Sequence, residues 1–256
     1  MALRILFLGD IFASTGRLLV ERRLSGLIGR EGLDLCLANG ENAAGGVGLT
    51  AQTAGELFDS GLEALSGGNH TFKYKDLVPL LNNDPRLIRP ANYPDPCPGK
   101  GWTILETAGG VKVGFGNIIG RVFMGPAFDC PFKAADRMLE KMREAGAQIT
   151  IIDFHAEATS EKMAMAWHLD GRLGALLGTH THVQTADAFI WPKGLAYISD
   201  VGMTGPHLSV IGMRPEETIA TLATGRIHRF SPAKGRPILQ GVILDFDDGF
   251  KAAAIT

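Results

Sequence analysis

Strand-like segments alternate with helical patterns along the N-terminal part of the chain, and this alternation constrains the fold more than any other feature. Residues 5–8 are wholly apolar, which is typical of a strand buried on both faces, and residues 33–38 and 62–65 are also strand-like. Apolar residues at helical spacing follow at 16–29 and again after Thr50, a residue type that caps helices. Strand and helix in alternation predict a parallel sheet, with functional residues at the carboxyl ends of its strands.

Each of these three strands ends in polar residues that can bind a metal ion. Asp10 follows the first strand, Glu41 and Asn42 follow the second, and Asn69 and His70 follow the third. The carboxyl ends of parallel strands meet at one edge of a sheet. We therefore expect these five side chains to lie close together.

The middle of the chain changes character. Residues 93–101 are rich in proline and predict a surface loop, whereas 102–107 and 111–115 predict a β-hairpin. A helix is expected from Pro131, at its first turn, to about Gly146. These segments predict an α/β fold with mixed sheets, and because no linker is visible we expect residues 1–256 to form a single domain.

Two further strands carry histidines at their ends. Residues 149–154 predict a buried strand that ends at His155, and a strand from Leu173 leads to His180 and His182. Alone, the two histidines in Gly178-Thr179-His180-Thr181-His182 fit a metal site or an exposed turn equally well. The polar residues at the other strand ends favour the metal site.

The strand ends together supply carboxylate, amide and imidazole groups but no thiolate, a set that suits manganese, iron or zinc. The number of these candidate ligands exceeds the four that one tetrahedral ion needs. The surplus predicts two ions about 3.5–4 Å apart that share a bridging carboxylate and hold a hydroxide between them for phosphoryl hydrolysis. We call these residues the strand-end cluster: Asp10, Glu41, Asn42, Asn69, His70, His155, His180 and His182.

Composition excludes several other classes of protein. The chain has 25 basic and 27 acidic side chains and a formal net charge of -2, which predicts neither duplex nucleic acid nor an anionic membrane as a partner. No apolar run reaches the length of a signal peptide or membrane span. Its three cysteines, Cys36, Cys97 and Cys130, form no Cys-x-x-Cys pair and predict reduced thiols in a cytoplasmic protein.

The ordered motifs of the chain resemble those of a known superfamily. Gly9-Asp10, Glu41-Asn42, Gly68-Asn69-His70, His155 and the block around His180 resemble the motifs of calcineurin-like metallophosphoesterases. Gly16-Arg17 and the blocks at 41–46, 153–162 and 200–205 resemble more closely the YmdB-like branch of that superfamily. The similarity spans nearly the whole chain.

This resemblance implies a four-layer αββα sandwich, in which helices flank two mixed sheets. It also implies a dinuclear, metal-dependent phosphodiesterase acting on 2′,3′-cyclic nucleotides or related small phosphodiesters, by attack of a metal-bridging hydroxide. The two ions, divalent or of mixed valence, would be iron or manganese, with zinc as a further option. We also expect a homo-oligomer.

The resemblance also implies a role for each residue of the cluster. Asp10, Asn42 and His182 would hold one metal ion, and Asn69, His155 and His180 would hold the other. Glu41 would bridge the two ions, and His70 would be the general acid, which protonates the leaving alkoxide.

The chain departs from the superfamily pattern at three places. Asp10 is followed by Ile11 and Phe12, so the usual histidine two positions later is missing. The bridging position holds Glu41 where the superfamily generally has aspartate. Phe72 and Lys73 stand where the branch often has an aromatic residue followed by an acidic one. The last departure concerns substrate contacts, not the metal ligands.

Two other functions share features of this pattern with a phosphodiesterase. A metal-dependent amidohydrolase on a TIM barrel also uses His-x-His, but after an early strand, whereas here the pair comes late. A non-catalytic or weakly catalytic metal-binding regulator could retain the same fold. The general-acid candidate His70 favours catalysis, because a pure binding protein does not need it. Outside the cluster, Glu157 is a candidate for orienting a metal-bound imidazole. Arg121 could contact phosphate, but an isolated arginine more often forms a surface ion pair, which we expect here.

Overall fold

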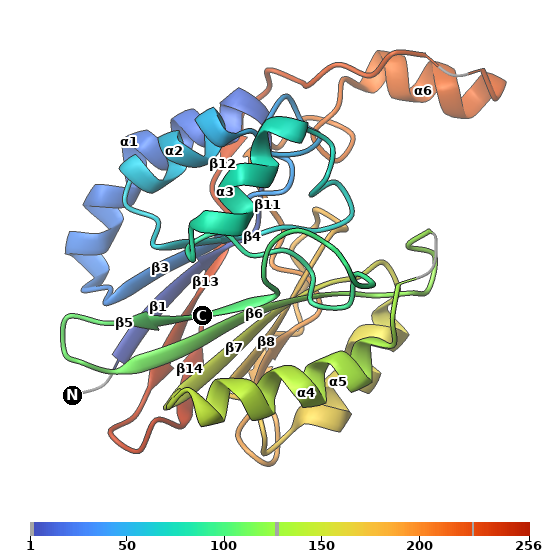
Figure 1. Ribbon diagram of the computed structural model, residues 1–256. Helices are drawn as coiled ribbons and strands as arrows, with labels where there is room; N and C mark the ends of the chain where they lie inside the picture. Colours follow the sequence, from blue (N-terminus) through green and yellow to red (C-terminus); the bar gives the residue numbers. More distant parts are fainter. Residues whose placement is uncertain (1–2, 126–127, 227) are drawn as a thin grey trace.

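The chain forms two mixed sheets packed face to face (Figure 1). The computed structural model describes residues 3–125, 128–226 and 228–256. The first sheet has the strand order β14-β13-β1-β3-β4. The strands β1, β3 and β4 run parallel, as the alternation of strands and helices predicts, and β13 pairs antiparallel with β1. The bounds are β1 (Leu3–Leu8), β3 (Leu35–Asn39), β4 (Ala64–Ser66), β13 (Gly241–Phe246) and β14 (Ala252–Ile255).

The second sheet has the order β5-β6-β7-β8-β10-β9. The predicted hairpin of β5 and β6 is confirmed, but β6 continues to Ile119 and also pairs in parallel with β7. The parallel strands of this sheet are thus β6, β7, β8 and β10. The bounds are β5 (Trp102–Glu106), β6 (Lys112–Ile119), β7 (Ile149–His155), β8 (Ala175–Thr179), β9 (Phe189–Ile190) and β10 (Ala196–Ile198).

Helices cover the outer face of each sheet, which confirms the αββα sandwich (Figure 1). Side chains between the sheets, such as Phe7 and Phe115, are fully buried. A separate core lies between each sheet and the helices on its outer face. Leu24 belongs to the core outside the first sheet, and Met138 belongs to the core outside the second. The helices are α1 (Ala13–Glu31), α2 (Ala51–Asp59) and α3 (Val78–Asn83), preceded by a 3₁₀ turn η1 (Lys75–Leu77), on one side, and α4 (Pro131–Glu144) and α5 (Thr159–Leu169) on the other.

Two helices begin at the residues that the sequence predicts. Thr50 caps α2 as predicted, since its hydroxyl accepts a hydrogen bond from the Thr53 backbone in a reciprocal capping box. Pro131 opens α4 as predicted. Helix α5 begins at Thr159, and Ala158 occupies its capping position without a side-chain hydrogen bond.

A third, small sheet and an isolated helix complete the fold. The strands β2 (Asp10–Ile11), β11 (Met203–Pro206) and β12 (Pro237–Ile238) form the small sheet. We did not predict it, because β2 and β12 have only two residues each, too few for a periodicity to be read. Helix α6 (Pro215–Thr224) contains no buried residue and projects from the body (Figure 1). Among the described residues, no helix is both long and apolar enough to cross a membrane.

Candidate metal centre

The strand-end cluster comes together at the carboxyl ends of strands from both sheets. Asp10 lies in β2, immediately after β1, and His155 is the last residue of β7. The remaining members lie in the loops after β3, β4 and β8. Hydrogen bonds and ion pairs link all eight residues of the cluster, so every site residue expected from the sequence lies in one place.

One half of the cluster surrounds the His155 ring. The Nε2 atom of His155 lies 2.9 Å from Asn69 Oδ1, 3.1 Å from Glu41 Oε1 and 3.1 Å from His180 Nδ1. One ligand atom each from Glu41, His155 and His180 lie within 4.8 Å of one another. Four donor atoms from four different loops or strands therefore face a common point.

The other half of the cluster surrounds the amide of Asn42. Its Nδ2 lies 3.3 Å from Asp10 Oδ1, 3.2 Å from Glu41 Oε1 and 3.1 Å from His182 Nε2. A half-turn of this amide presents Oδ1 to the same point without moving any other atom. Glu41 Oε1 belongs to both halves, so this carboxylate lies between two groups of donors.

His70 lies beside the cluster and not at the centre of either half. Its Nδ1 is 3.2 Å from Glu41 Oε1, and its backbone N–H donates a hydrogen bond to Glu41 Oε2. Its Nε2 is 3.1 Å from Asn69 Nδ2. The side chain is 37% exposed, whereas that of Glu41 is 1% exposed. His70 is therefore oriented by the cluster and remains open to a molecule that arrives from solvent.

A buried chain of hydrogen bonds determines which nitrogen of His155 faces the cluster. The hydroxyl of Thr179 donates to Asp153 Oδ1 at 2.7 Å, so it must accept the hydrogen bond that links it to His155 Nδ1 at 2.9 Å. The proton of a neutral His155 is therefore on Nδ1. In this neutral form, which a metal ligand needs, the Nε2 lone pair faces Glu41. Without a metal ion, burial opposes protonation of His155, but the Glu41 carboxylate raises its pKa to about 9, so Nε2 then carries a proton and donates it to Glu41.

The polar layer that forms this chain of hydrogen bonds was not predicted from the sequence. Asp153 also accepts hydrogen bonds from Asn39 Nδ2, at 2.8 Å, and from Ser66 Oγ. Along β7, residues 149 and 151 face the apolar space between the sheets, and Asp153 and His155 continue the same face. The signal was present in the sequence as a period of two that turns from apolar to polar.

The two histidines after β8 have left-handed backbone conformations. The ring of each one also contacts a residue outside the cluster. His180 has φ 101° and His182 has φ 65°. The Nε2 of His180 lies 3.2 Å from Glu157 Oε2, which fits the orienting role considered for Glu157. His182 Nδ1 donates to the Ile211 carbonyl at 2.8 Å, which directs its Nε2 toward Asp10. Strained backbone of this kind is concentrated at functional sites.

A buried ion pair also stabilises the loop that carries His180 and His182. Lys162 Nζ, 2% exposed, donates hydrogen bonds to Asp200 Oδ2 at 3.0 Å and to the Thr179 carbonyl at 2.9 Å. Asp200 Oδ2 also accepts from the backbone N–H of Thr181 at 3.0 Å. The pair thus joins the end of β8, the histidine loop and the end of β10, although its two residues are distant in the sequence.

The carboxylates of the cluster are held anionic by neighbouring imidazoles, whose protons a divalent ion would displace. Burial opposes ionisation of Glu41, but His155 and His70 hold the pKa of its carboxyl well below its usual range. Asp10 is fully buried and would have a raised pKa, yet His182 lowers it. Burial and the adjacent His155 lower the pKa of His180 to about 3. Two buried anionic carboxylates and a neutral imidazole are groups that a divalent ion binds and neutralises.

Other residues considered from the sequence lie outside the cluster. Phe72 packs edge-on against Tyr93, with ring centroids 5.2 Å apart, and Lys73 is exposed. The carboxylate of Glu161 accepts hydrogen bonds from the backbone N–H groups of Arg121 and Val122. No ion pair of the Arg121 side chain occurs among the described residues, so the expected surface ion pair is absent there.

An αββα sandwich whose strand ends carry carboxylate, amide and imidazole ligands to one point defines the metallophosphoesterase class of protein. A family model described as YmdB-like protein matches residues 6–256. The chain belongs to this YmdB-like family.

Individual relatives agree with this assignment. The chain is 45% identical over 251 residues to the 2′,3′-cyclic-nucleotide 2′-phosphodiesterase of Bacillus subtilis strain 168, covering 98% of this chain and 94% of that protein. A crystal structure of a hypothetical protein from Thermus thermophilus matches with TM-score 0.93 and 44% identity, over 99% of this chain and 97% of that one. A phosphatase structure from Mycoplasma pneumoniae matches with TM-score 0.93 and 33% identity, over 100% of this chain and 92% of that one.

Proposed function

We propose that this protein is a metal-dependent phosphodiesterase that hydrolyses 2′,3′-cyclic nucleotides or related small phosphodiesters in the cytoplasm. The observation that carries the proposal is the position of Glu41 between two groups of donors, with the exposed ring of His70 bonded to it. The name of the Bacillus subtilis relative supports the substrate class.

The donor set fits two metal ions. In the proposed arrangement, Asp10, Asn42 and His182 hold one ion, Asn69, His155 and His180 hold the other, and Glu41 contributes to both. Oxygen and imidazole ligands without thiolate suit iron or manganese, with zinc as a further option, in divalent or mixed-valence form. When bound, such a pair supplies Lewis acidity, which activates water and neutralises the charge of a phosphodiester.

The residues of the chain position the substrate and move its proton. The proposed role of His70 is to donate a proton to the alkoxide that leaves the phosphorus atom, a step that contributes about 10²–10⁴-fold to such reactions. Glu41 orients the ring through its contact with Nδ1. The exposed face of His70 provides the access that a small phosphodiester requires.

Metal analysis combined with hydrolysis of bis-p-nitrophenyl phosphate and 2′,3′-cyclic AMP tests this proposal. We expect His180→Ala to lose both metal and activity, because it removes a ligand. We expect His70→Ala to keep its metal and lose about 10²–10⁴-fold in turnover. His228→Ala, which removes an exposed imidazole outside the cluster, is the matched control and should behave as wild type.

The same experiment separates the two candidate functions. A wild-type protein that binds metal but hydrolyses no phosphoester would contradict catalysis and favour the metal-binding regulator. Absence of metal after anaerobic purification with iron or manganese would contradict both functions.

A further inference from the structure

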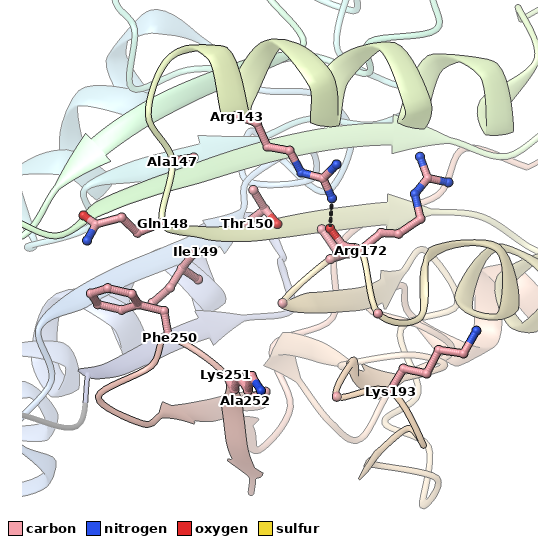
Figure 2. A pocket seen from close by; sticks show the side chains of 14 residues that line it. Arg143, Ala147, Gln148, Ile149, Thr150, Arg172, Lys193, Phe250, Lys251 and Ala252 are labelled. Atoms are coloured by element: carbon pink, nitrogen blue, oxygen red, sulfur yellow. Dashed lines mark hydrogen bonds between the residues drawn. The ribbon is translucent and has the colours of Figure 1, made fainter.

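A second polar cavity lies at the end of the sandwich opposite the strand-end cluster (Figure 2). Its volume is about 270 Å³. Its walls are the start of β7, the segment that leads into β8, the turn before β10 and the turn between β13 and β14. Ile149 lines the cavity and His155 lies in the cluster, at opposite ends of β7, a separation of about 20 Å. The cavity is therefore distinct from the candidate metal centre.

The charged side chains that line the cavity all have one sign. Four of its 14 lining residues are cationic and none is acidic. Because the whole chain has a formal net charge of -2, this excess of positive charge is local. A concave site with one sign of charge concentrates ligands of the opposite sign. The four cationic residues are Arg143, Arg172, Lys193 and Lys251.

Carboxylates near the cavity are bound to other groups. Asp136 accepts a hydrogen bond from Arg172 Nη2 at 2.6 Å, so the charge of Arg172 is partly neutralised. Asp170 accepts hydrogen bonds from the backbone N–H of Lys193, at 3.1 and 3.2 Å, and does not pair with its ammonium. Within the described part of the chain, the other three cationic side chains form no ion pair. They remain available to an anionic ligand.

Two of these cationic side chains are held in place. Arg143 Nη2 donates a hydrogen bond to the Arg172 carbonyl at 2.9 Å, the dashed line in Figure 2. The stem of Lys193 lies over Gly171, where an added Cβ would be 3.0 Å from Lys193 Cβ. Gly171 has φ 84°, a conformation that glycine adopts without strain. These contacts restrict the side chains of Arg143 and Lys193.

An aromatic ring forms the other wall of the cavity. Phe250 is half-buried and lies near Gln148 and Ile149, away from Lys193 (Figure 2). Its inner side packs against the core between the sheets. An aromatic face of this kind stacks with the planar base of a nucleotide. The cavity therefore has a cationic part and an aromatic part.

We propose that this cavity binds a nucleoside monophosphate, with its phosphate at Arg143, Lys193 and Lys251 and its base against Phe250. Arginine and lysine are the side chains that bind phosphate oxygens most strongly. The volume of about 270 Å³ lies just below the ~300 Å³ at which ligand pockets begin, so a single nucleotide is the largest ligand of this class that we assign to it. The proposal does not depend on the hydrolytic function of the cluster.

Hydrogen–deuterium exchange of the full chain with adenosine 5′-monophosphate tests the proposal segment by segment. In wild type, we expect the ligand to protect residues 143–152 and 247–252. The double variant Arg143→Glu/Lys193→Glu should raise the concentration for half-protection at least about tenfold, since it replaces two attractive charges by repulsive ones. Arg137→Glu/Lys133→Glu, on the exposed face of α4, changes the net charge equally and should leave the midpoint unchanged.

Protection around His180 reports ligand at the metal centre in the same samples, so the two sites are distinguished. Protection there without protection of 143–152 and 247–252 would overturn the proposal, as would an unchanged midpoint in the Arg143→Glu/Lys193→Glu variant. Inorganic phosphate is the second probe. Stronger protection of 247–252 by the nucleotide supports the role of Phe250, and equal protection by phosphate would overturn the nucleoside assignment.

Discussion

The hydroxyl of Thr179 lies between Asp153 and His155, and it determines which imidazole nitrogen faces the cluster. Because this hydroxyl donates to a carboxylate, it can only accept from His155. One buried oxygen therefore sets the tautomer of a proposed metal ligand. Groups that orient a metal-binding histidine affect metal affinity without touching the ion.

Replacing Thr179 by valine tests this role. Thr179→Val keeps the shape of the side chain and removes the hydrogen bond to His155, so metal affinity should fall about 10–100-fold. Competition with a calibrated chelator measures the change. Thr103→Val, another buried threonine of the second sheet, is the control. Equal metal affinity in the two variants would show that Thr179 does not orient His155.

Lys162 and Asp200 make a second residue-scale prediction. Their ion pair is buried and supports the loop that carries the two histidines. Lys162→Met leaves Asp200 buried without its partner, which should lower the free energy of unfolding by about 3–5 kcal/mol. Urea denaturation measures this change, and Lys133→Met at an exposed position is the control. A loss below about 1 kcal/mol would contradict the supporting role.

At the scale of elements, sequence periodicity predicts the strands and helices that build the layers, but not the pieces that position the site. Residues at the ends of long, regular strands can be found because the pattern stops at a polar group. Asp10 lies in β2, whose pairing with Met203 of β11 joins segments far apart in the chain. Such pairings depend on tertiary structure, and the same holds for Lys162 with Asp200.

Strand β3 offers a chemical probe of the first sheet. Burial raises the pKa of the Cys36 thiol to about 12, with the carboxylate of Glu63 contributing. The thiolate that reacts with disulfide reagents is therefore scarce near neutral pH. In a Cys97→Ser/Cys130→Ser variant, Ellman's reagent at pH 8 should label Cys36 only after denaturant is added. Rapid labelling of the native protein would mean that β3 is accessible.

At the scale of the whole molecule, the apolar core between the two sheets joins both sheets to the strand-end cluster. Side chains from both sheets, including Phe7 and Phe115, form one core, and the strand-end cluster closes that core at one end. The site therefore cannot form unless both sheets pack together.

Helix α6 stands apart, with Ile219 and Leu222 exposed. The expected homo-oligomer stays a prediction, which light scattering tests.

The shared core also makes the single domain testable. We propose that residues 1–256 unfold as one unit, because the inner face of each sheet is buried by packing against the other sheet. Scanning calorimetry should show one transition, with calorimetric and van't Hoff enthalpies in agreement. Two separate transitions would indicate two domains.

We propose that the strand ends of two sheets build one centre for two metal ions joined through Glu41. Metal content per chain, measured by inductively coupled plasma mass spectrometry after purification with iron or manganese, tests it most directly. We expect two ions per chain in the wild type and a loss of both in Glu41→Ala. One ion per chain in wild type, or two ions retained in Glu41→Ala, would contradict it.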